Sequence, residues 1–205
     1  MYKNAHFTET DEEKVFEFMQ KKPFAFVAGM QNNFPVATHV PLEIKKINNR
    51  IILSGHIMKD SDHYRAFSLN ENVLVIFTGP HCYVSASWYA VKNVASTWNY
   101  MDVHVKGKIK FTDDKGTKTI IENITNHFEK PRSEAAFDKM PAEYVYRMLK
   151  AIIGFQIEAE SVENVFKLSQ NRDKISKQQI IENLSKSNNY FEKEIAKEMD
   201  IRNKK

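Results

Sequence analysis

The clearest hydrophobic pattern in the chain is a strict alternation over residues 101–111. Apolar or small residues occupy every odd position from Met101 to Phe111, and Asp, His and Lys occupy the even positions. A period of two predicts a long β-strand with one buried face. Gly107 lies on the buried side of this pattern and indicates either a bulge or the close approach of another chain segment.

Short β-prone runs separated by Asn-rich turns fill residues 24–54. They are Phe24–Ala28, Pro35–Val40, Leu42–Ile47 and Ile51–Ser54, with turns at Gln31–Asn33 and Asn48–Asn49. This order predicts an antiparallel meander. Further strands are predicted at Val73–Phe77, which ends at Gly79-Pro80, and at Gly154–Ala159.

Helical patterns frame these strands. The first is predicted to begin at a capping box formed by Thr10 and Glu13 and to stop at Pro23. Other helical stretches are Ser61–Leu69, Lys118–Phe128, Ala142–Ala151, Ser176–Ser185 and Tyr190–Ile201. Many short strands with few intervening helices favour a mainly β fold, a closed or partly closed barrel with the late helices packed outside.

Composition narrows the class of protein. The chain is 42% hydrophobic and 27% charged, as is typical of a globular domain. No run approaches the roughly 20 apolar residues of a membrane helix, and the N-terminus lacks a signal-peptide pattern, so we expect a soluble cytoplasmic protein. Cys82 is the only cysteine, which excludes an internal disulfide, and we expect it to be a packed residue.

The sequence lacks the motifs of several common catalytic and phosphate-binding sites. There is no Gly-x-Ser-x-Gly elbow and no glycine-rich phosphate loop, and the chain has only six glycines. A bound phosphate must therefore be held by side chains. The histidines are scattered without metal-ligand spacing, so no metal site is expected.

Aromatic residues are dense between positions 83 and 100, where hydroxyl and amide side chains interleave them. The rings are Tyr83, Trp88, Tyr89, Trp98 and Tyr100. Two interpretations are open: an aromatic-rich core at the end of the barrel, or a slot for a flat ring system with polar groups for its edge.

Two groups of donors could meet an anion. Ser54-Gly55-His56 with Lys59 stands opposite Thr38-His39 in the meander, and this set of hydroxyl, imidazole and ammonium groups suits a phosphate. The loop Lys167–Arg172 offers a second set. The alternatives are a capped helix with a solvated lysine and a solvated loop.

Taken together, these segments resemble the PaiB-like FMN-binding negative transcriptional regulators, which are similar to the pyridoxamine phosphate oxidase group of split barrels. The resemblance rests on Tyr83–Tyr89, Thr97–Tyr100, Val103–Gly107, Gly55-His56 and Met148–Phe155, with further matches at Met1-Tyr2, His39–Leu42 and Lys167–Arg172. It runs from residue 1 to about residue 185. It implies an FMN-binding split β-barrel over residues 1–172, followed by a C-terminal helical extension over residues 173–205.

The resemblance also implies a homodimer with FMN at the subunit interface. Its site residues would be Thr38, His39 and Val40 along the flavin, Ser54, His56 and Lys59 at the phosphate, and Trp98, Asn99, Lys167, Ser169, Gln170 and Arg172 closing the site. No catalytic residue is assigned, although Asp102 and His104 lie on the strand expected to face the site.

The chain departs from the family pattern after Gly55-His56. The family continues Leu-Ala-Arg-Ala-Asn-Pro, whereas this chain has Ile-Met-Lys-Asp-Ser-Asp over residues 57–62. Lys59 replaces an arginine as a point charge but not as a bidentate fork, and Asp60 adds a negative charge nearby. Ala86 stands where a proline is usual. The first two changes predict altered phosphate binding.

Three functions follow from these observations. The resemblance implies a transcriptional regulator that acts on DNA. The alternative is an FMN-dependent oxidoreductase acting on a small molecule, because FMN itself carries out hydride or electron transfer. A haem-binding barrel with a histidine axial ligand is the third. The charge of the chain supports DNA binding only weakly, because residues 174–205 contain eight Lys or Arg and five Asp or Glu.

Overall fold

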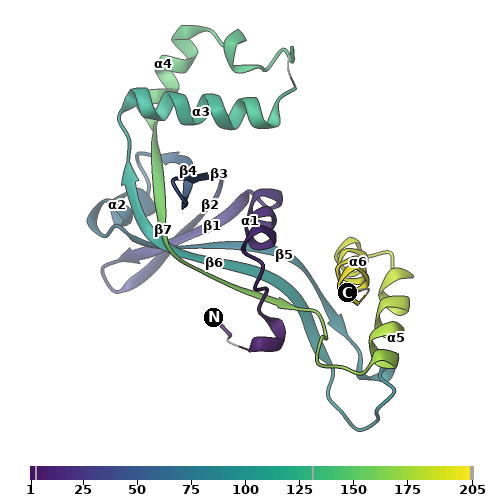
Figure 1. The fold of residues 1–205 in the computed structure, drawn as a ribbon. Helices are drawn as coiled ribbons and strands as arrows, with labels where there is room; N and C mark the ends of the chain where they lie inside the picture. Colours follow the sequence, from purple (N-terminus) through teal and green to yellow (C-terminus); the bar gives the residue numbers. More distant parts are fainter. Residues whose placement is uncertain (3, 131, 204–205) are drawn as a thin grey trace. The chain divides into compact units, whose positions relative to one another are not determined.

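The computed structural model of the protein describes residues 1–2, 4–130 and 132–203 (Figure 1). The helices are α1 (Glu12–Lys21), α2 (Asp62–Leu69), α3 (Asp114–Phe128), α4 (Ala142–Ala151), α5 (Lys174–Ser185) and α6 (Tyr190–Asn203). The strands are β1 (Phe24–Gln31), β2 (Phe34–Pro41), β3 (Glu43–Ile47), β4 (Arg50–Met58), β5 (Asn72–Val84), β6 (Thr97–Phe111) and β7 (Ile152–Lys167). They form a seven-stranded sheet in the order β2-β1-β5-β6-β7-β4-β3. The predicted mainly β fold with peripheral helices is confirmed.

The predicted continuous meander is wrong: the four strands form two antiparallel hairpins, and β2 and β3 lie at opposite edges of the sheet. β1 pairs antiparallel with β2 over its whole length, and β3 pairs in the same way with β4. The turns between them use Asn residues with positive φ, 54° at Asn32, 49° at Asn48 and 65° at Asn49. Asn adopts this left-handed conformation more readily than most residues, which is why Asn-rich turns connect these strands.

Several strands run further than the hydrophobic pattern predicted, among them β4 and β5. β4 continues past Ser54-Gly55-His56 to Met58, because its residues 52–58 pair with residues 158–152 of β7. The prediction that this strand ends at Ser54-Gly55-His56 is therefore wrong. The predicted end of β5 at Gly79-Pro80 is wrong as well, since the strand passes through both residues to Val84. Pairing with neighbouring strands extends each one beyond its apolar run.

Side-chain caps begin most helices. Asp11, rather than the predicted Thr10, caps α1: its carboxylate accepts hydrogen bonds from the backbone N–H groups of Glu13 and Lys14. Ser61 caps α2 by accepting from the N–H of Tyr64, and Asp113 and Asp173 cap α3 and α5. Each cap satisfies backbone donors that the first turn of a helix leaves without a partner.

The chain divides into two compact units, each assembled from separate segments. The first unit contains residues 1–16, 78–103 and 163–205, and the second contains residues 17–77 and 104–162. β5, β6 and β7 each contribute residues to both units. The first unit thus includes residues 173–205 along with parts of three strands, while the predicted boundary at residue 172 stays a prediction.

The second unit contains the β1–β2 and β3–β4 hairpins, α2, α3 and α4. Its core is formed by fully buried side chains from the sheet, among them Val27, Leu53, Val75, Phe77, Phe155 and Ile157. Gly107 marks the close approach that the sequence indicated: a Cβ added there would lie 2.3 Å from the backbone oxygen of Glu158. β6 and β7 therefore come together at this point more closely than a side chain would allow.

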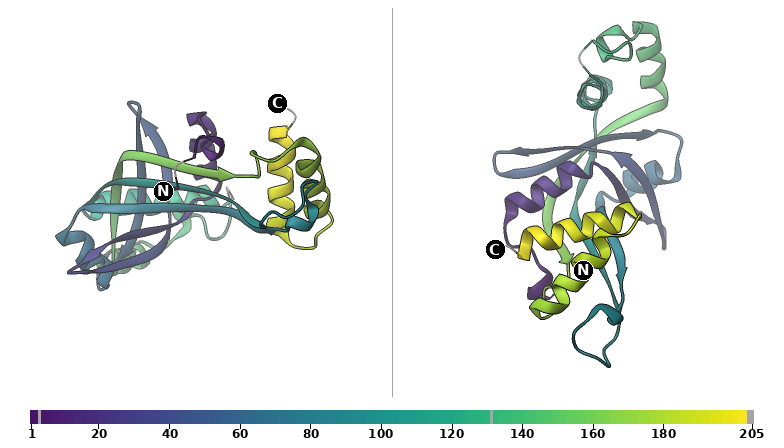
Figure 2. Two further views of the ribbon diagram at one scale, coloured as in Figure 1. Left: turned by 90° about the horizontal axis from the view of Figure 1, so that it is seen from below. Right: turned by 90° about the vertical axis from the view of Figure 1, so that its right-hand side faces the viewer.

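The first unit contains α5 and α6, which lie side by side in both Figure 1 and Figure 2. Ile180, Leu184 and Ile195 of these helices are fully buried. The last turn of α6 is tied to the N-terminal segment, because Arg202 forms an ion pair of 2.5 Å with Glu9. Asn164 of β7 in turn accepts from the Glu9 N–H at 2.8 Å and donates to the Glu9 carbonyl at 3.0 Å.

None of the helices in the described ranges has the length and apolar composition needed to cross a membrane. Cys82 is buried in β5, as predicted, and burial together with the nearby Glu192 raises the pKa of its thiol to about 12. Such a thiol stays protonated near neutral pH and is a poor nucleophile.

Candidate functional site

The twelve residues predicted to bind flavin are divided equally between the two units. The second unit holds Thr38, His39, Val40, Ser54, His56 and Lys59, and the first holds Trp98, Asn99, Lys167, Ser169, Gln170 and Arg172. Their role in flavin binding stays a prediction. The surroundings of each group can nevertheless be described within its own unit.

Ser54 and His56 lie on one face of β4, because alternate residues of a strand point the same way. Ser54 is 5% exposed, and His56 is half-buried. The Nδ1 atom of His56 is buried and has no hydrogen-bond partner within the described part of the chain. Burial lowers the pKa of His56 below its ordinary value of 6.5, so the ring is neutral at pH 7. A buried, unpaired ring nitrogen is a natural contact for a ligand.

Gly55 and Gly154 let neighbouring groups approach this part of β4. A Cβ at Gly55 would lie 2.7 Å from the Phe155 ring and 2.9 Å from Leu42, on the face opposite Ser54 and His56. Gly154, which pairs with His56, has Thr112 Oγ1 and the α3 backbone equally close, and its N–H donates to Thr117 Oγ1 at 2.8 Å. Glycine at both positions therefore lets the strands and α3 pack tightly around His56.

Lys59 has partners within its own unit, and its role in phosphate binding stays a prediction. Its ammonium donates to the Leu149 carbonyl at 2.9 Å and lies 3.8 Å from the Asp114 carboxylate, while its backbone N–H donates to the Ala151 carbonyl. A cation at the C-terminal end of α4 is favourable because the last carbonyls of a helix lack internal partners. A phosphate at Lys59 would have to compete with these contacts. Asp60, the other departure from the family pattern, pairs with Arg65 at the surface.

Thr38, His39 and Val40 do not share one face of β2. Val40 is 5% exposed on the inner face, and Thr38 lies on the same side by alternation. His39 is exposed on the outer face, where its ring stacks on Phe24 at 5.6 Å and meets Phe26 edge-on at 5.0 Å. The side chains of these three residues are therefore divided between the two faces of β2.

In the first unit, the structure brings Asn99 and Ser169 together from distant parts of the sequence. The Ser169 hydroxyl donates to Asn99 Oδ1 at 3.0 Å, and Asn99 Nδ2 donates to the sulfur of Met199 at 3.5 Å. Asn99 is fully buried and Ser169 is 2% exposed. This pair forms a buried polar contact beneath α6.

The other members of the Lys167–Arg172 loop are also engaged inside the unit. Lys167 donates to Thr97 Oγ1 at 2.5 Å and lies 5.9 Å above the Phe7 ring. Gln170 bonds the backbone of its own loop, donating to the Phe166 carbonyl and accepting from the Leu168 N–H. The Arg172 guanidinium lies 4.3 Å above the Tyr89 ring. These contacts hold the loop to the strands and leave Lys167, Gln170 and Arg172 half-buried.

Trp98 differs from these five residues because its side chain is 54% exposed. It adjoins two other rings, Tyr83 at 6.1 Å and His81 at 6.2 Å. His81 in turn lies 4.9 Å from Phe191 of α6. Sequence reasoning did not single out His81 or Phe191, since no spacing in the sequence indicates that α6 packs beside β5.

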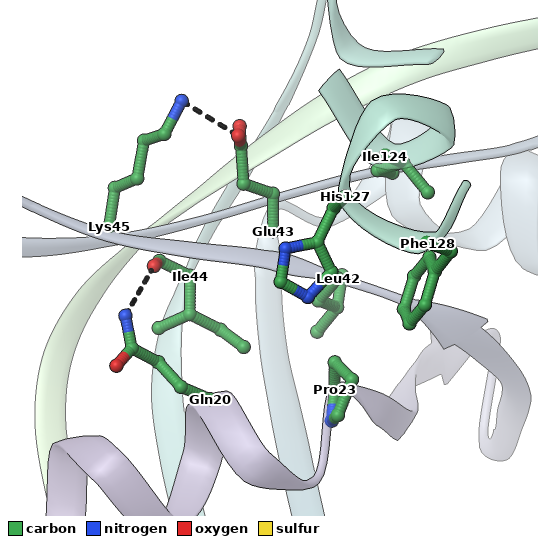
Figure 3. Close-up of a pocket in the computed structure, with 9 residues that line it drawn as sticks. All are labelled: Gln20, Pro23, Leu42, Glu43, Ile44, Lys45, Ile124, His127 and Phe128. Carbon is green, nitrogen blue, oxygen red and sulfur yellow. Dashed lines mark hydrogen bonds and ion pairs between the residues drawn. The ribbon is translucent and has the colours of Figure 1, made fainter. Parts of the chain in front are cut away.

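Two cavities of the second unit lie beside α3. The one in Figure 3, of about 370 Å³, has a mixed apolar and polar lining and contains none of the predicted flavin residues. Its lining is Gln20, Pro23, Leu42, Glu43, Ile44, Lys45, Ile124, His127 and Phe128. The other, of about 390 Å³, is lined by Ser54 among mostly polar neighbours, including Gln156, Thr119 and Lys115. Of these two cavities, only the second is lined by a residue predicted to bind the phosphate, Ser54.

The described residues contain no group of three or more His, Cys, Asp or Glu side chains placed to hold a metal ion. Asp102 and His104 are half-buried residues of β6, and both have interactions within the protein. Their positions do not assign a catalytic role to either.

Comparison with known proteins places the chain in a family. Residues 1–161 match a family model described as "Putative FMN-binding domain". The chain is 34% identical to the protease synthase and sporulation protein PAI 2 of Bacillus subtilis, over 100% of this chain and 99% of that protein.

Solved structures show the fold. A FAD- and haem-binding protein from Mycobacterium smegmatis has a TM-score of 0.60 at 17% identity, covering 78% of this chain and 73% of that one. A protein from Bacteroides thetaiotaomicron, described as a putative 5-nitroimidazole antibiotic resistance protein, has a TM-score of 0.54 at 13% identity, with 80% and 92% covered.

The residues present fit a flavin. In the second unit, the buried Nδ1 of His56 has no partner among the described residues and can contact a ligand. In the first unit, the Trp98 ring is 54% exposed. The family match covers the strands that carry both residues. The chain is a member of the PaiB-like family of FMN-binding split-barrel proteins, and FMN is its cofactor.

Proposed function

We propose that this protein is an FMN-binding regulator of gene expression that acts as a cytoplasmic homodimer. The observation that carries the proposal is the match to PAI 2, which extends over 99% of that protein and includes the C-terminal helices. PAI 2 is named for protease synthesis and sporulation, so the regulatory role of this chain is inferred from likeness along its whole length.

We infer that Ser54 and His56 of the second unit help to bind the phosphate end of FMN. Ser54 can donate through its hydroxyl, and the neutral His56 ring can donate from one nitrogen. Trp98 offers an exposed aromatic face. FMN supplies hydride or electron transfer when bound. The protein's own task is to bind and orient it.

The outer face of the β1–β2 hairpin supports dimerisation. Its outward residues are apolar apart from His39, and Phe24 and Met30 are 65% and 42% exposed. β2 is also an edge strand of the sheet. An apolar sheet face with a free edge is normally covered by a partner. Sedimentation velocity should show a dimer, and a stable monomer that still binds FMN tightly would refute this part of the proposal.

FMN binding is tested directly by the visible spectrum of the purified protein and by titration of added FMN. His56→Ala should raise the Kd for FMN about 5- to 30-fold, the range for losing one or two hydrogen bonds. His127→Ala is the matched control, since this exposed histidine belongs to the cavity of Figure 3 and should leave the Kd unchanged. A colourless protein that does not quench flavin fluorescence would remove the basis of the proposed function.

The regulatory role is tested with DNA from the protein's own promoter region. Specific binding whose affinity falls steeply with salt would support the regulator, because each phosphate contact releases counterions. The oxidoreductase alternative predicts the opposite result: no specific DNA binding, but reduction of bound FMN by a nicotinamide donor with multiple turnovers.

A further inference from the structure

Four aromatic rings form a continuous exposed row on the first unit, which we call the aromatic row. It consists of Phe191 from α6, His81 and Tyr83 from β5, and Trp98 from β6. Successive ring centroids are 4.9 Å apart from Phe191 to His81, 6.2 Å from His81 to Trp98, and 6.1 Å from Trp98 to Tyr83. The rings are tilted or edge-on to one another, so each keeps part of its face open.

The members of the row point outward from well-ordered elements. His81 and Tyr83 are alternate, exposed positions of β5, while Cys82 between them is buried. Tyr83, Trp98 and Phe191 are 49%, 54% and 40% exposed. Rings at these positions contribute little to the core, although a soluble protein gains nothing by exposing them to water.

α6 is fixed to the unit at three points, and Phe191 is one of them. Met199 accepts from Asn99, the residue that follows Trp98, and Arg202 pairs with Glu9. Figure 2 shows α6 beside the ends of β5 and β6, consistent with the contact of Phe191 with His81. The matched FMN-binding region stops at residue 161, so it contains neither Phe191 nor the rest of α6.

The exposed area of the aromatic row indicates which kind of partner it can bind. A full aromatic side chain has roughly 200 Å² of surface, so four rings about half exposed offer on the order of 400 Å². A stable protein interface needs about 800 Å² on each partner. The row is too small for a protein partner by itself, but it is a suitable surface for one flat ring system, which gains from stacking and edge-on contacts.

We propose that the C-terminal helix α6 completes the flavin site, with Phe191 joining His81, Tyr83 and Trp98 in binding the isoalloxazine ring. This inference rests on the proposed function, because the ring in question is that of FMN. It assigns a ligand-binding role to a segment outside the matched FMN-binding region. It also means that α5 and α6 are part of the binding domain and not an independent appendage.

The test uses full-length protein and FMN titrated by flavin fluorescence. Phe191→Ala and Phe191→Leu should each raise the Kd for FMN about 2- to 10-fold, the range for one aromatic contact, while Phe191→Tyr should restore it. Tyr190→Ala is the matched control: Tyr190 is the neighbouring α6 residue, 63% exposed, and its ring contacts Phe191 without belonging to the row. It should change the Kd less than twofold.

The outcomes separate the inference from the function on which it rests. If wild-type protein does not bind FMN, both fail. If Trp98→Ala weakens binding while Phe191→Ala does not, only the inference fails. Normal binding by Phe191→Leu would overturn it too, because leucine keeps the packing but not the ring. Conversion of the dimer to a monomer by Phe191→Ala would show instead that the row is a subunit contact.

Discussion

Gly107 provides the sharpest test of the packing of the sheet. Alanine in a strand normally stabilises a protein by about 0.5–1 kcal/mol relative to glycine, because glycine loses more backbone freedom on folding. At Gly107, however, the added Cβ would lie 2.3 Å from the Glu158 backbone oxygen and 2.9 Å from Ile157 Cγ2. A backbone oxygen in a paired strand cannot rotate away, so β6 and β7 would have to separate locally.

The cost of such overpacking is about 1–3 kcal/mol, and the backbone clash places Gly107→Ala at the upper end of that range. After the gain in propensity is subtracted, we expect a net loss of about 2 kcal/mol in the free energy of unfolding. For a chain of 205 residues this lowers Tm by roughly 4–8 °C. Urea denaturation followed by circular dichroism measures the change.

Lys106→Ala is the matched control, because Lys106 is the exposed neighbour of Gly107 on the same strand. It should alter stability by no more than about 0.5 kcal/mol. A Gly107→Ala protein as stable as the wild type, or more stable, would show that β6 and β7 are not in the close contact described.

Three further predictions concern buried groups. Because burial depresses the pKa of His56, the folded state favours its neutral ring. The free energy of unfolding should therefore be highest above about pH 6.5 and fall as the pH drops below that value. Urea melts at several pH values should show a shallower fall for a His56→Gln variant. Cys82, with a pKa raised to about 12, should not react with a thiol reagent at pH 8 in the folded protein but should react in 8 M urea, and rapid labelling of the native state would contradict its burial. Asn99→Ala should lower the free energy of unfolding by about 1–3 kcal/mol without FMN, because it leaves the buried Ser169 hydroxyl unpaired; an unchanged urea midpoint would argue against the contact.

Local sequence determined most of the elements of this protein. The alternation over residues 101–111 predicted β6, the Asn-rich segments predicted the turns of the two hairpins, and α4 spans the residues that its pattern indicated. These signals are strong because side-chain periodicity and turn preference act between residues close in sequence. The family resemblance likewise rested on contiguous motifs, and the comparisons confirmed it.

The tertiary structure decided where strands end and what the predicted site residues touch. β4 and β5 extend beyond their apolar segments because hydrogen bonds to neighbouring strands satisfy their backbone groups. The sequence around each strand does not indicate which strand will pair with it. The sequence predicted Lys59 as a phosphate ligand. In the structure its ammonium donates to the Leu149 carbonyl near the C-terminal end of α4, 90 residues further along the chain.

Asn99 and the aromatic row show the same limit. The sequence by itself determined that Trp98 and Asn99 belong to a segment rich in polar and aromatic side chains. Only the fold placed Met199 in contact with Asn99. It also brought Phe191 beside His81, whose ring adjoins Trp98. Contacts between distant segments depend on packing the whole unit, because many side chains must fit together before any one pair can meet.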